Sequence, residues 1–238
     1  MMKKRIWELD ALRGLCILGV IVVHFVYDIT VLYRIADWTP PQAFQFVQRW
    51  GGILFLLISG ICVTLGSRCV KRGLIVFACG LLISAVTYGM YYFGFSGKGI
   101  IIYFGVLHCL GTCMLLWPIF RKWHWASLLS LAAVLIAIGF VLMDMEAVEY
   151  HWLMPLGLPW KGFISSDYFP LLPNFGFFLA GAGFGRLLYG KKETLLPKVN
   201  AQNPILRFLC FCGKHSLWIY LLHQPILNGI CWLMMQSK

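Results

Sequence analysis

The chain has 238 residues, of which 60% are hydrophobic and only 12% charged, and its formal net charge is +11 at pH 7. A soluble domain of this length has too little interior to cover that much apolar surface, whereas a lipid bilayer can. A positive charge of this size is typical of nucleic-acid-binding domains when the basic residues gather on one soluble surface. Here Lys and Arg lie in short runs between long apolar stretches, which indicates a membrane protein in contact with lipid and no nucleic-acid partner.

The apolar stretches predict an all-α, polytopic bundle of about seven transmembrane helices. A helical crossing takes about 17–25 predominantly apolar residues. Residues 40–50 and 203–213 are too short and too polar to cross, and we expect them at the membrane interfaces. We expect the whole chain, 1–238, to form a single transmembrane domain. The predicted spans are 12–32, 51–67, 73–93, 99–119, 126–143, 171–189 and 216–235.

The distribution of Lys and Arg predicts the orientation, because cytoplasmic loops carry an excess of both. With the N-terminus inside, the inner segments hold 15 of the 20 Lys and Arg residues and the outer segments hold the other 5. Seven crossings then place the C-terminus outside. The acidic residues favour the same orientation, since six of the nine fall on the outer side: Asp28, Asp37, Asp144, Glu146, Glu149 and Asp167.

The longest outer segment, 144–170, is unusually apolar for a free loop. It contains Trp152, Pro155, Pro159 and Trp160. We expect it to fold back onto the outer face as a re-entrant segment or lid.

The first span carries four ionisable residues, and each one costs about 2.5–3.5 kcal/mol to insert at mid-membrane. At about 100° per residue, Asp10, Arg13, His24 and Asp28 fall within an arc of roughly 60°. Arg13 and His24 are about 16 Å apart along the axis. A polar stripe across the bilayer favours a functional site. The alternative is an ion pair of Asp10 with Arg13 at the helix entry and one interhelical hydrogen bond from His24.

Two further spans contain histidines. His108 lies in the fourth predicted span, and His223 lies in the last, where it shares a helix face with Ser216 and Tyr220. Pro225 removes one backbone donor from that helix, which leaves a carbonyl group available for another partner. Polar groups in lipid turn inward and meet one another, so we expect the histidines to share a pocket. The alternative is that each is a packing residue with its own hydrogen bonds.

Asp167 precedes the sixth predicted span and is followed by Pro170 and Pro173. One interpretation places its carboxylate in a polar lumen. The other places it at the positive end of the helix dipole, as an ordinary N-terminal residue. We expect no metal site, because the nine cysteines lie mostly in apolar runs and show no CxxC or His/Cys ligand spacing.

Four short sequence blocks carry a resemblance to a known family. Arg13 lies in the first block, and His24 follows it at the spacing Arg-x10-His. Together the blocks resemble the heparan-alpha-glucosaminide N-acetyltransferase catalytic-domain family, in particular its short bacterial members. The Arg-x10-His spacing resembles the first span of the related type-three membrane acyltransferases. The resemblance runs from about residue 5 to residue 228. The blocks are 8–14 (ELDALRG), 55–60 (FLLISG), 167–173 (DYFPLLP) and 216–225 (SLWIYLLHQP).

This resemblance implies an acyltransferase of the bacterial cytoplasmic membrane. Such an enzyme takes an acyl group, usually acetyl, from cytoplasmic acyl-CoA and delivers it to a carbohydrate or glycolipid acceptor at the outer face. His24 matches the catalytic histidine of the type-three family, and Arg13 matches its arginine partner. Larger members of the resembled family use a histidine in the loop after the first span, whereas residues 33–50 contain none.

The acyl-transfer hypothesis assigns a role to each polar group. His24 is the general base, oriented by Asp28 one turn further on, because histidine takes and returns protons near neutrality. The predicted catalytic residues are His24, Asp28, Asp167 and His223. The predicted acyl-CoA-binding residues are Asp10, Arg13, His108, Arg68, Arg72, Arg121 and Lys122, with the basic residues meeting the CoA phosphates.

Two other functions use the same stripe differently. A proton- or ion-coupled transporter of small solutes would use the Asp and His side chains as a relay. The sequence shows no inverted repeat and only one Pro-broken span of the kind that transporters use. A catalytically silent scaffold is the third hypothesis. Glycines in the sixth span permit a homodimer without requiring one.

Overall fold

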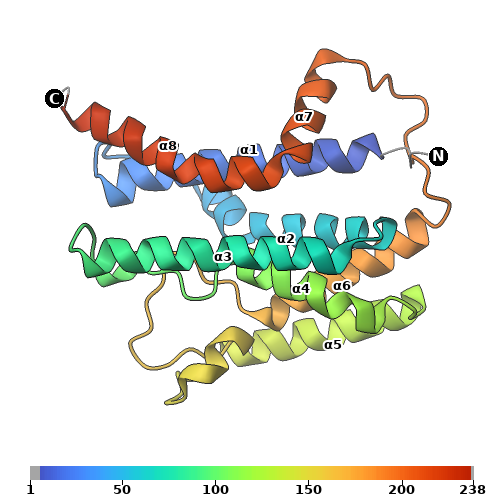
Figure 1. The fold of residues 1–238 in the computed structure, drawn as a ribbon, viewed down its shortest axis with the longest axis horizontal. Helices are drawn as coiled ribbons and strands as arrows, with labels where there is room; N and C mark the ends of the chain where they lie inside the picture. Colours follow the sequence, from blue (N-terminus) through green and yellow to red (C-terminus); the bar gives the residue numbers. More distant parts are fainter. Residues whose placement is uncertain (1–5, 237–238) are drawn as a thin grey trace. The chain divides into compact units, whose positions relative to one another are not determined.

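The computed structural model describes residues 6–236, and over this range it consists of helices and their connections, with two isolated bridge pairs in place of any strand. The chain divides into two units, one comprising the residues up to Phe55 together with those from Lys192 onward, and the other Leu56–Lys191. The helices, labelled in Figure 1, are α1 (Trp7–Tyr27) with a π-helical extension (Asp28–Leu32), α2 (Gln42–Leu65), α3 (Cys69–Tyr92), α4 (Val106–Phe120), α5 (Trp125–Met143), α6 (Leu171–Leu188), α7 (Pro204–Lys214) and α8 (Ser216–Gln236), with 3-10 turns at Lys98–Ile100 and His151–Leu156.

Six helices are long and apolar enough to cross a membrane, and α4 is a shorter apolar helix. This confirms a polytopic helical membrane protein. Two predicted boundaries were wrong. Residues 42–50, expected as a separate interfacial piece, are the first turns of α2, and the span expected at 99–119 becomes helical only at Val106.

The direction of the helices within each unit requires α4 to count as a crossing. In the first unit α1 and α8 run parallel, since Arg13 meets Ser216 and Tyr33 meets Asn228. The first and last spans of a chain are parallel only if the number of crossings is odd. Six long helices alone would make them antiparallel.

The helix directions in the second unit also require α4 to count as a crossing. A Cβ atom on Gly60 of α2 would meet the backbone of Phe178, and one on Gly185 of α6 would meet Ile61 and Thr64. These pairings advance together along both helices, so α2 and α6 are parallel. An even number of reversals must separate them, which again includes α4 and gives seven crossings.

A 15-residue helix such as α4 is about 22 Å long, which is less than the roughly 30 Å of a bilayer core. The non-helical residues ahead of it supply the missing length, and Ile101 and Phe104 there are buried. Irregular backbone is tolerated at membrane depth only where its polar groups find protein partners. Here the Ile102 N–H donates to Thr87 Oγ1 at 3.2 Å, and its carbonyl accepts from Ser84 Oγ at 2.5 Å.

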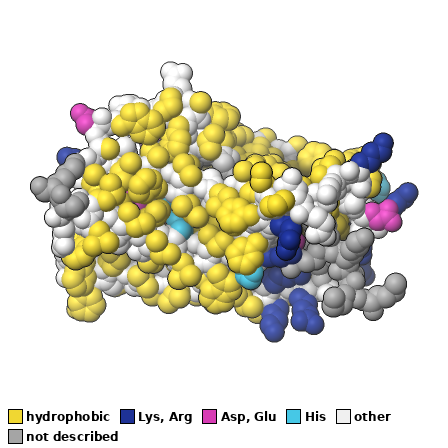
Figure 2. Space-filling model, turned by 90° about the horizontal axis from the view of Figure 1, so that it is seen from above, with side chains coloured by type: hydrophobic (Ala, Val, Ile, Leu, Met, Phe, Trp, Pro, Cys, Tyr) yellow, Lys and Arg dark blue, Asp and Glu magenta, His cyan; other side chains and the backbone are white. Residues whose placement is uncertain are grey.

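In the first unit, α7 packs closely on α1. Side chains on Gly14 and Gly213 would overlap the carbonyl oxygens of Leu209 and Asp10 respectively. The two backbones can therefore approach only because both positions are glycine. Much of α1 and α8 is apolar and exposed, and Figure 2 shows hydrophobic side chains over most of one face of the molecule, as expected for a surface that faces lipid.

In the second unit, α3 pairs antiparallel with α4, and α5 pairs antiparallel with α6. Helices α3 and α4 meet closely at Gly73 and Gly111, and helices α5 and α6 meet closely at Gly139 and Pro173. The antiparallel order brings the connections of this unit to two ends. The α2–α3 and α4–α5 connections lie at one end with the end of α6, and the 93–105 and 144–170 connections lie at the other.

Candidate active site

Three of the four ionisable residues predicted to share a face of the first span contact α8. Arg13 donates from Nη2 to Ser216 Oγ at 3.2 Å. Two to three turns further on, Nδ1 of His24 lies 3.0 Å from Oε1 of Gln224. The Nε2 amide of Gln224 donates to both carboxylate oxygens of Asp28, at 3.1 and 3.0 Å. The helical spacing therefore places these groups on one seam between α1 and α8.

Asp28 was expected to orient His24 directly, but the structure places an amide between them. Gln224 accepts from the imidazole and donates to the carboxylate. The carboxylate is 1% exposed, so it needs such a donor. Asp28 also begins the π-helical turn that extends α1, a type of irregularity frequent at functional sites.

His223 lies against His24 on the same seam. The two ring centroids are 4.9 Å apart, and the rings meet edge to face at 89°. Nδ1 of His223 lies 2.5 Å from the carbonyl oxygen of Tyr220. A carbonyl can only accept, so Nδ1 carries the proton and Nε2 carries a lone pair. That Nε2 is buried and has no hydrogen-bond partner among residues 6–236.

The N-terminal turns of α1 are held by α7 and by the segment that precedes α7. Glu8 is buried and accepts from Thr194 Oγ1 at 2.9 Å and from the Leu195 N–H at 2.8 Å. Asp10 is also buried, and its carbonyl oxygen lies against Gly213. Both acids thus lie where α1 packs on α7. A role of Asp10 in binding acyl-CoA stays a prediction.

His108 lies in the second unit and has both ring nitrogens engaged. Nδ1 accepts from the Gly105 N–H at 3.2 Å, which closes the start of α4, and Nε2 lies 3.3 Å from Ser84 Oγ. The ring is stacked on Phe104 and meets the edge of Phe77. This environment matches the packing interpretation. The expected pocket shared by all three histidines would join the two units and stays a prediction.

Asp167 caps a different helix from the one expected. Its Oδ2 accepts from the Val106 N–H at 3.0 Å, at the first residue of α4, although 61 positions separate the two. The sixth span itself begins later, at Leu171. Since Asp167 also lies against Gly105, where any side chain would overlap its carboxylate, the loop and the helix start fit closely. The geometry favours N-terminal capping, and the catalytic assignment of Asp167 stays a prediction.

We expect Asp167→Ala to lower the stability of the protein by about 1 kcal/mol, because one end of α4 loses its acceptor. Asp167→Asn keeps an oxygen at this position and should cost less. Thermal unfolding in detergent and the rate of the acyl transfer expected from the sequence should be measured for both variants. A loss of rate in both, with unfolding unchanged, would contradict the capping role and support the catalytic one.

The predicted lid, 144–170, is attached to the buried segment ahead of α4. Ser165 and Ser166 donate to the carbonyls of Ile101 and Gly99 at 2.9 and 2.7 Å. Within the lid, the Tyr168 hydroxyl donates to the Met154 carbonyl at 2.7 Å, and burial raises the pKa of Tyr168 to about 12. The phenol therefore stays protonated and keeps this bond across the physiological pH range. Opening of this segment as a lid stays a prediction.

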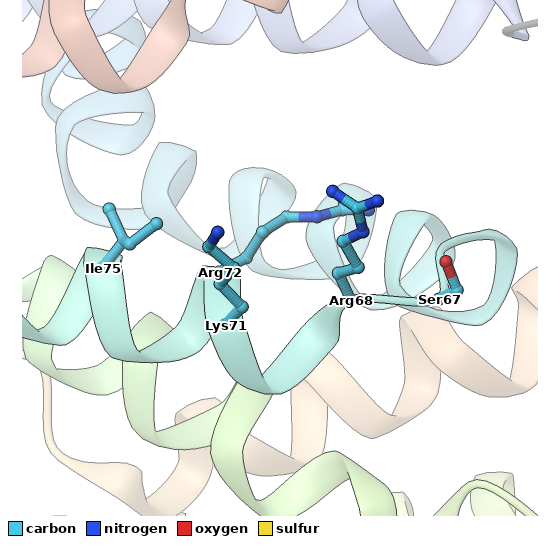
Figure 3. A pocket seen from close by; sticks show the side chains of 5 residues that line it. All are labelled: Ser67, Arg68, Lys71, Arg72 and Ile75. Atoms are coloured by element: carbon cyan, nitrogen blue, oxygen red, sulfur yellow. The ribbon is translucent and has the colours of Figure 1, made fainter.

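The basic residues predicted to meet CoA phosphates lie at one end of the second unit. Arg68, Lys71 and Arg72 line a hollow of about 520 Å³ at the start of α3, together with Ser67 and Ile75 (Figure 3). All five are exposed. They can therefore reach a soluble anion.

The α4–α5 connection contributes to the same end. The side chains of Arg121 and Lys122 are exposed, while the backbone carbonyls of Arg121 and Trp123 accept hydrogen bonds from the Arg186 guanidinium. The guanidinium also lies 5.6 Å from the ring centre of Trp117. Arg186 thus holds the connection in place through backbone carbonyls, and the two basic side chains stay exposed.

Sequence reasoning missed Gln224, Ser84 and Arg186. Gln224 directly follows His223 in the block SLWIYLLHQP, so the motif contained it, but its partners are almost 200 positions away. Ser84 and Arg186 lie in none of the four sequence blocks, so no motif pointed to them. Over the described part of the chain, no three His, Cys, Asp or Glu side chains gather as a metal site.

Six long apolar helices and the shorter apolar helix α4, with a histidine–amide–carboxylate array between α1 and α8, define a polytopic helical membrane protein with a polar site among its spans. A family model described as heparan-alpha-glucosaminide N-acetyltransferase, catalytic, matches residues 5–225. The chain belongs to this family, which makes it an acetyltransferase-like integral membrane enzyme. Comparisons with curated proteins and with solved structures gave no match.

Proposed function

We propose that the protein transfers an acetyl group from acetyl-CoA to a hydroxyl or amino group of a sugar or glycolipid acceptor, with His24 as general base. The observation that carries this proposal is the pair of histidines on the α1–α8 seam. Both Nδ1 atoms are held by acceptor oxygens, which leaves the lone pair of each ring on Nε2, the atom that would take a proton or hydrogen bond from a substrate. Family membership supplies the acetyl chemistry.

In the proposed step, Nε2 of His24 takes the proton of the acceptor as its oxygen or nitrogen attacks the thioester carbonyl. A new carbon–oxygen or carbon–nitrogen bond forms, and the carbonyl becomes a tetrahedral oxyanion. When the carbonyl reforms, the carbon–sulfur bond breaks. The CoA thiolate then takes the proton from His24 and leaves as free CoA. The unpaired Nε2 of His223 accepts a hydrogen bond from the acceptor and so helps to place it.

The second unit is proposed to bind the phosphates of acetyl-CoA at its basic end. Guanidinium groups bind phosphate oxygens through charge-assisted, often bidentate, hydrogen bonds. Seven of the nine Lys and Arg residues of this unit lie at that end, and its four acids lie at the other: Asp144, Glu146, Glu149 and Asp167. By the positive-inside rule the basic end is cytoplasmic, where acetyl-CoA is available, so the acceptor would be acetylated from the outer side.

This proposal predicts that acetyl-CoA raises the melting temperature of the purified protein and that free CoA is released when an acceptor is present. The triple variant Arg68→Gln, Lys71→Gln, Arg72→Gln should raise the KM for acetyl-CoA about tenfold or more, since a hydrogen bond to a charged group contributes about 1.5–3 kcal/mol. Thiol release and thermal shift in lipid nanodiscs measure both effects.

Two controls make this test specific. Acetyl-pantetheine lacks the nucleotide and its phosphates, so its turnover should not respond to the triple variant. The double variant Lys98→Gln, Lys161→Gln removes charge from the opposite end of the unit and should behave as the wild type. If acetyl-CoA neither protects the wild-type protein nor releases CoA, the enzyme proposal fails and the transporter hypothesis replaces it.

A further inference from the structure

Gln224 of α8 lies between His24 of α1 and Asp28 of the π-helical extension of α1. Its Oε1 is 3.0 Å from Nδ1 of His24, and its Nε2 is 3.1 and 3.0 Å from the two oxygens of Asp28. A side-chain amide suits this position because it accepts at one end and donates at the other. Glutamate could not donate to Asp28, and an apolar residue could do neither.

The chemistry of the three groups fixes where the protons lie. A carboxylate only accepts, so the NH₂ of Gln224 faces Asp28 and its carbonyl oxygen faces His24. A carbonyl oxygen likewise only accepts, so Nδ1 of His24 carries the hydrogen in that bond. Neutral His24 is therefore held in the tautomer whose lone pair is on Nε2. Burial of Asp28 keeps water from competing for the amide.

We propose that Gln224 is the positioning residue that transmits the orientation of Asp28 to His24 and fixes Nε2 as the basic atom. The inference rests on the proposed function of His24 as general base. When the substrate proton reaches Nε2, the imidazolium keeps its Nδ1–H bond to the amide, and the amide keeps its bonds to the carboxylate. The negative charge of Asp28 thus stabilises the positive ring through an oriented dipole without taking up a proton.

The first test is Gln224→Leu, which removes both ends of the amide. We expect kcat/KM for acetyl transfer to fall roughly 10- to 100-fold, the range seen when the hydrogen-bond partner that orients a metal-ligating histidine is removed. The fraction of His24 in the Nδ1–H tautomer should fall with it. This fraction is measured by ¹⁵N spectroscopy of histidine-labelled protein, in which the His24 signal is identified by its loss in the His24→Ala variant.

The double variant Gln224→Glu, Asp28→Asn separates the relay from simple packing. The introduced glutamate accepts from Nδ1–H of His24, and the introduced asparagine donates to the glutamate. The same His24 tautomer is therefore favoured, with the negative charge moved from position 28 to position 224. We expect it to recover most of the rate lost in Gln224→Glu alone, where two carboxylates face each other. Asn228→Leu is the matched control, because Asn228 binds Tyr33 one turn along the same seam and should leave the rate unchanged.

The outcomes distinguish this inference from the function on which it rests. A wild-type rate in Gln224→Leu with the His24 tautomer unchanged would overturn the role of Gln224 and leave the acetyltransferase proposal intact. Failure of the wild-type protein to release CoA would remove the proposed function. The tautomer measurement would even then decide whether Gln224 holds His24.

Discussion

Replacing His24 with alanine should lower the rate of acetyl transfer by roughly 10²–10⁴-fold, the contribution typical of a positioned general base. The physical reason is that, in the proposed mechanism, the acceptor loses its proton as it attacks the thioester, and Nε2 of His24 takes that proton because Nδ1 is bonded to Gln224. Binding of acetyl-CoA should persist, because its phosphates are proposed to bind elsewhere. Thiol release at saturating acetyl-CoA measures the rate, and thermal shift measures binding.

His215→Ala is the matched control for this variant. His215 belongs to the same unit but is exposed at the end of α7, where its ring lies against Phe211. Its loss should change neither rate nor binding. A His24→Ala protein that turns over at the wild-type rate would remove His24 from the chemistry, and His223, with its unpaired Nε2, would then become the candidate base.

Much of the architecture could be predicted because it depends on local pattern. Hydropathy located the crossings, and a period of 3.6 residues placed Arg13, His24 and Asp28 on the face that meets α8. Neither method could locate the start of α4. Residues 101–104 are as apolar as a helix, yet they are not helical, because their backbone groups are bonded by side chains from α3 and from the 144–170 segment.

The partners of the site residues were less predictable, since they depend on contacts between distant parts of the chain. Periodicity alone paired Asp28 with His24, four positions away on the same helix. The structure inserts Gln224 from α8 between them. One of the two interpretations placed Asp167 at the N-terminus of the sixth span, but the helix whose first N–H it binds is α4, which begins 61 positions earlier. Which side chain meets which helix end is decided by packing, and neither periodicity nor hydropathy in a single sequence predicts that contact.

The second large effect is expected from Gly14→Ala, which adds one methyl group where α1 crosses α7. The new Cβ would overlap the carbonyl oxygen of Leu209, and backbone atoms cannot move aside as a flexible side chain could. The helices must separate, which would also loosen the contact of Gly213 with Asp10. Overpacking of this kind costs about 1–3 kcal/mol. Since Arg13 is the preceding residue and binds Ser216, we expect acetyl transfer to fall together with the melting temperature.

Gly19→Ala provides the control on the same helix. A Cβ at Gly19 meets nothing within 4 Å, so the substitution adds no overlap. In a helix interior, alanine is more stable than glycine by roughly 0.5–1 kcal/mol, so this variant should melt at the same temperature as the wild type or slightly higher. Thermal unfolding of the two variants side by side in one detergent measures the difference. If Gly14→Ala unfolds no earlier than Gly19→Ala, α7 does not pack on α1 through its backbone. The position of Arg13 beside Ser216 would then need another explanation, because that close approach is what holds the start of α1 in place.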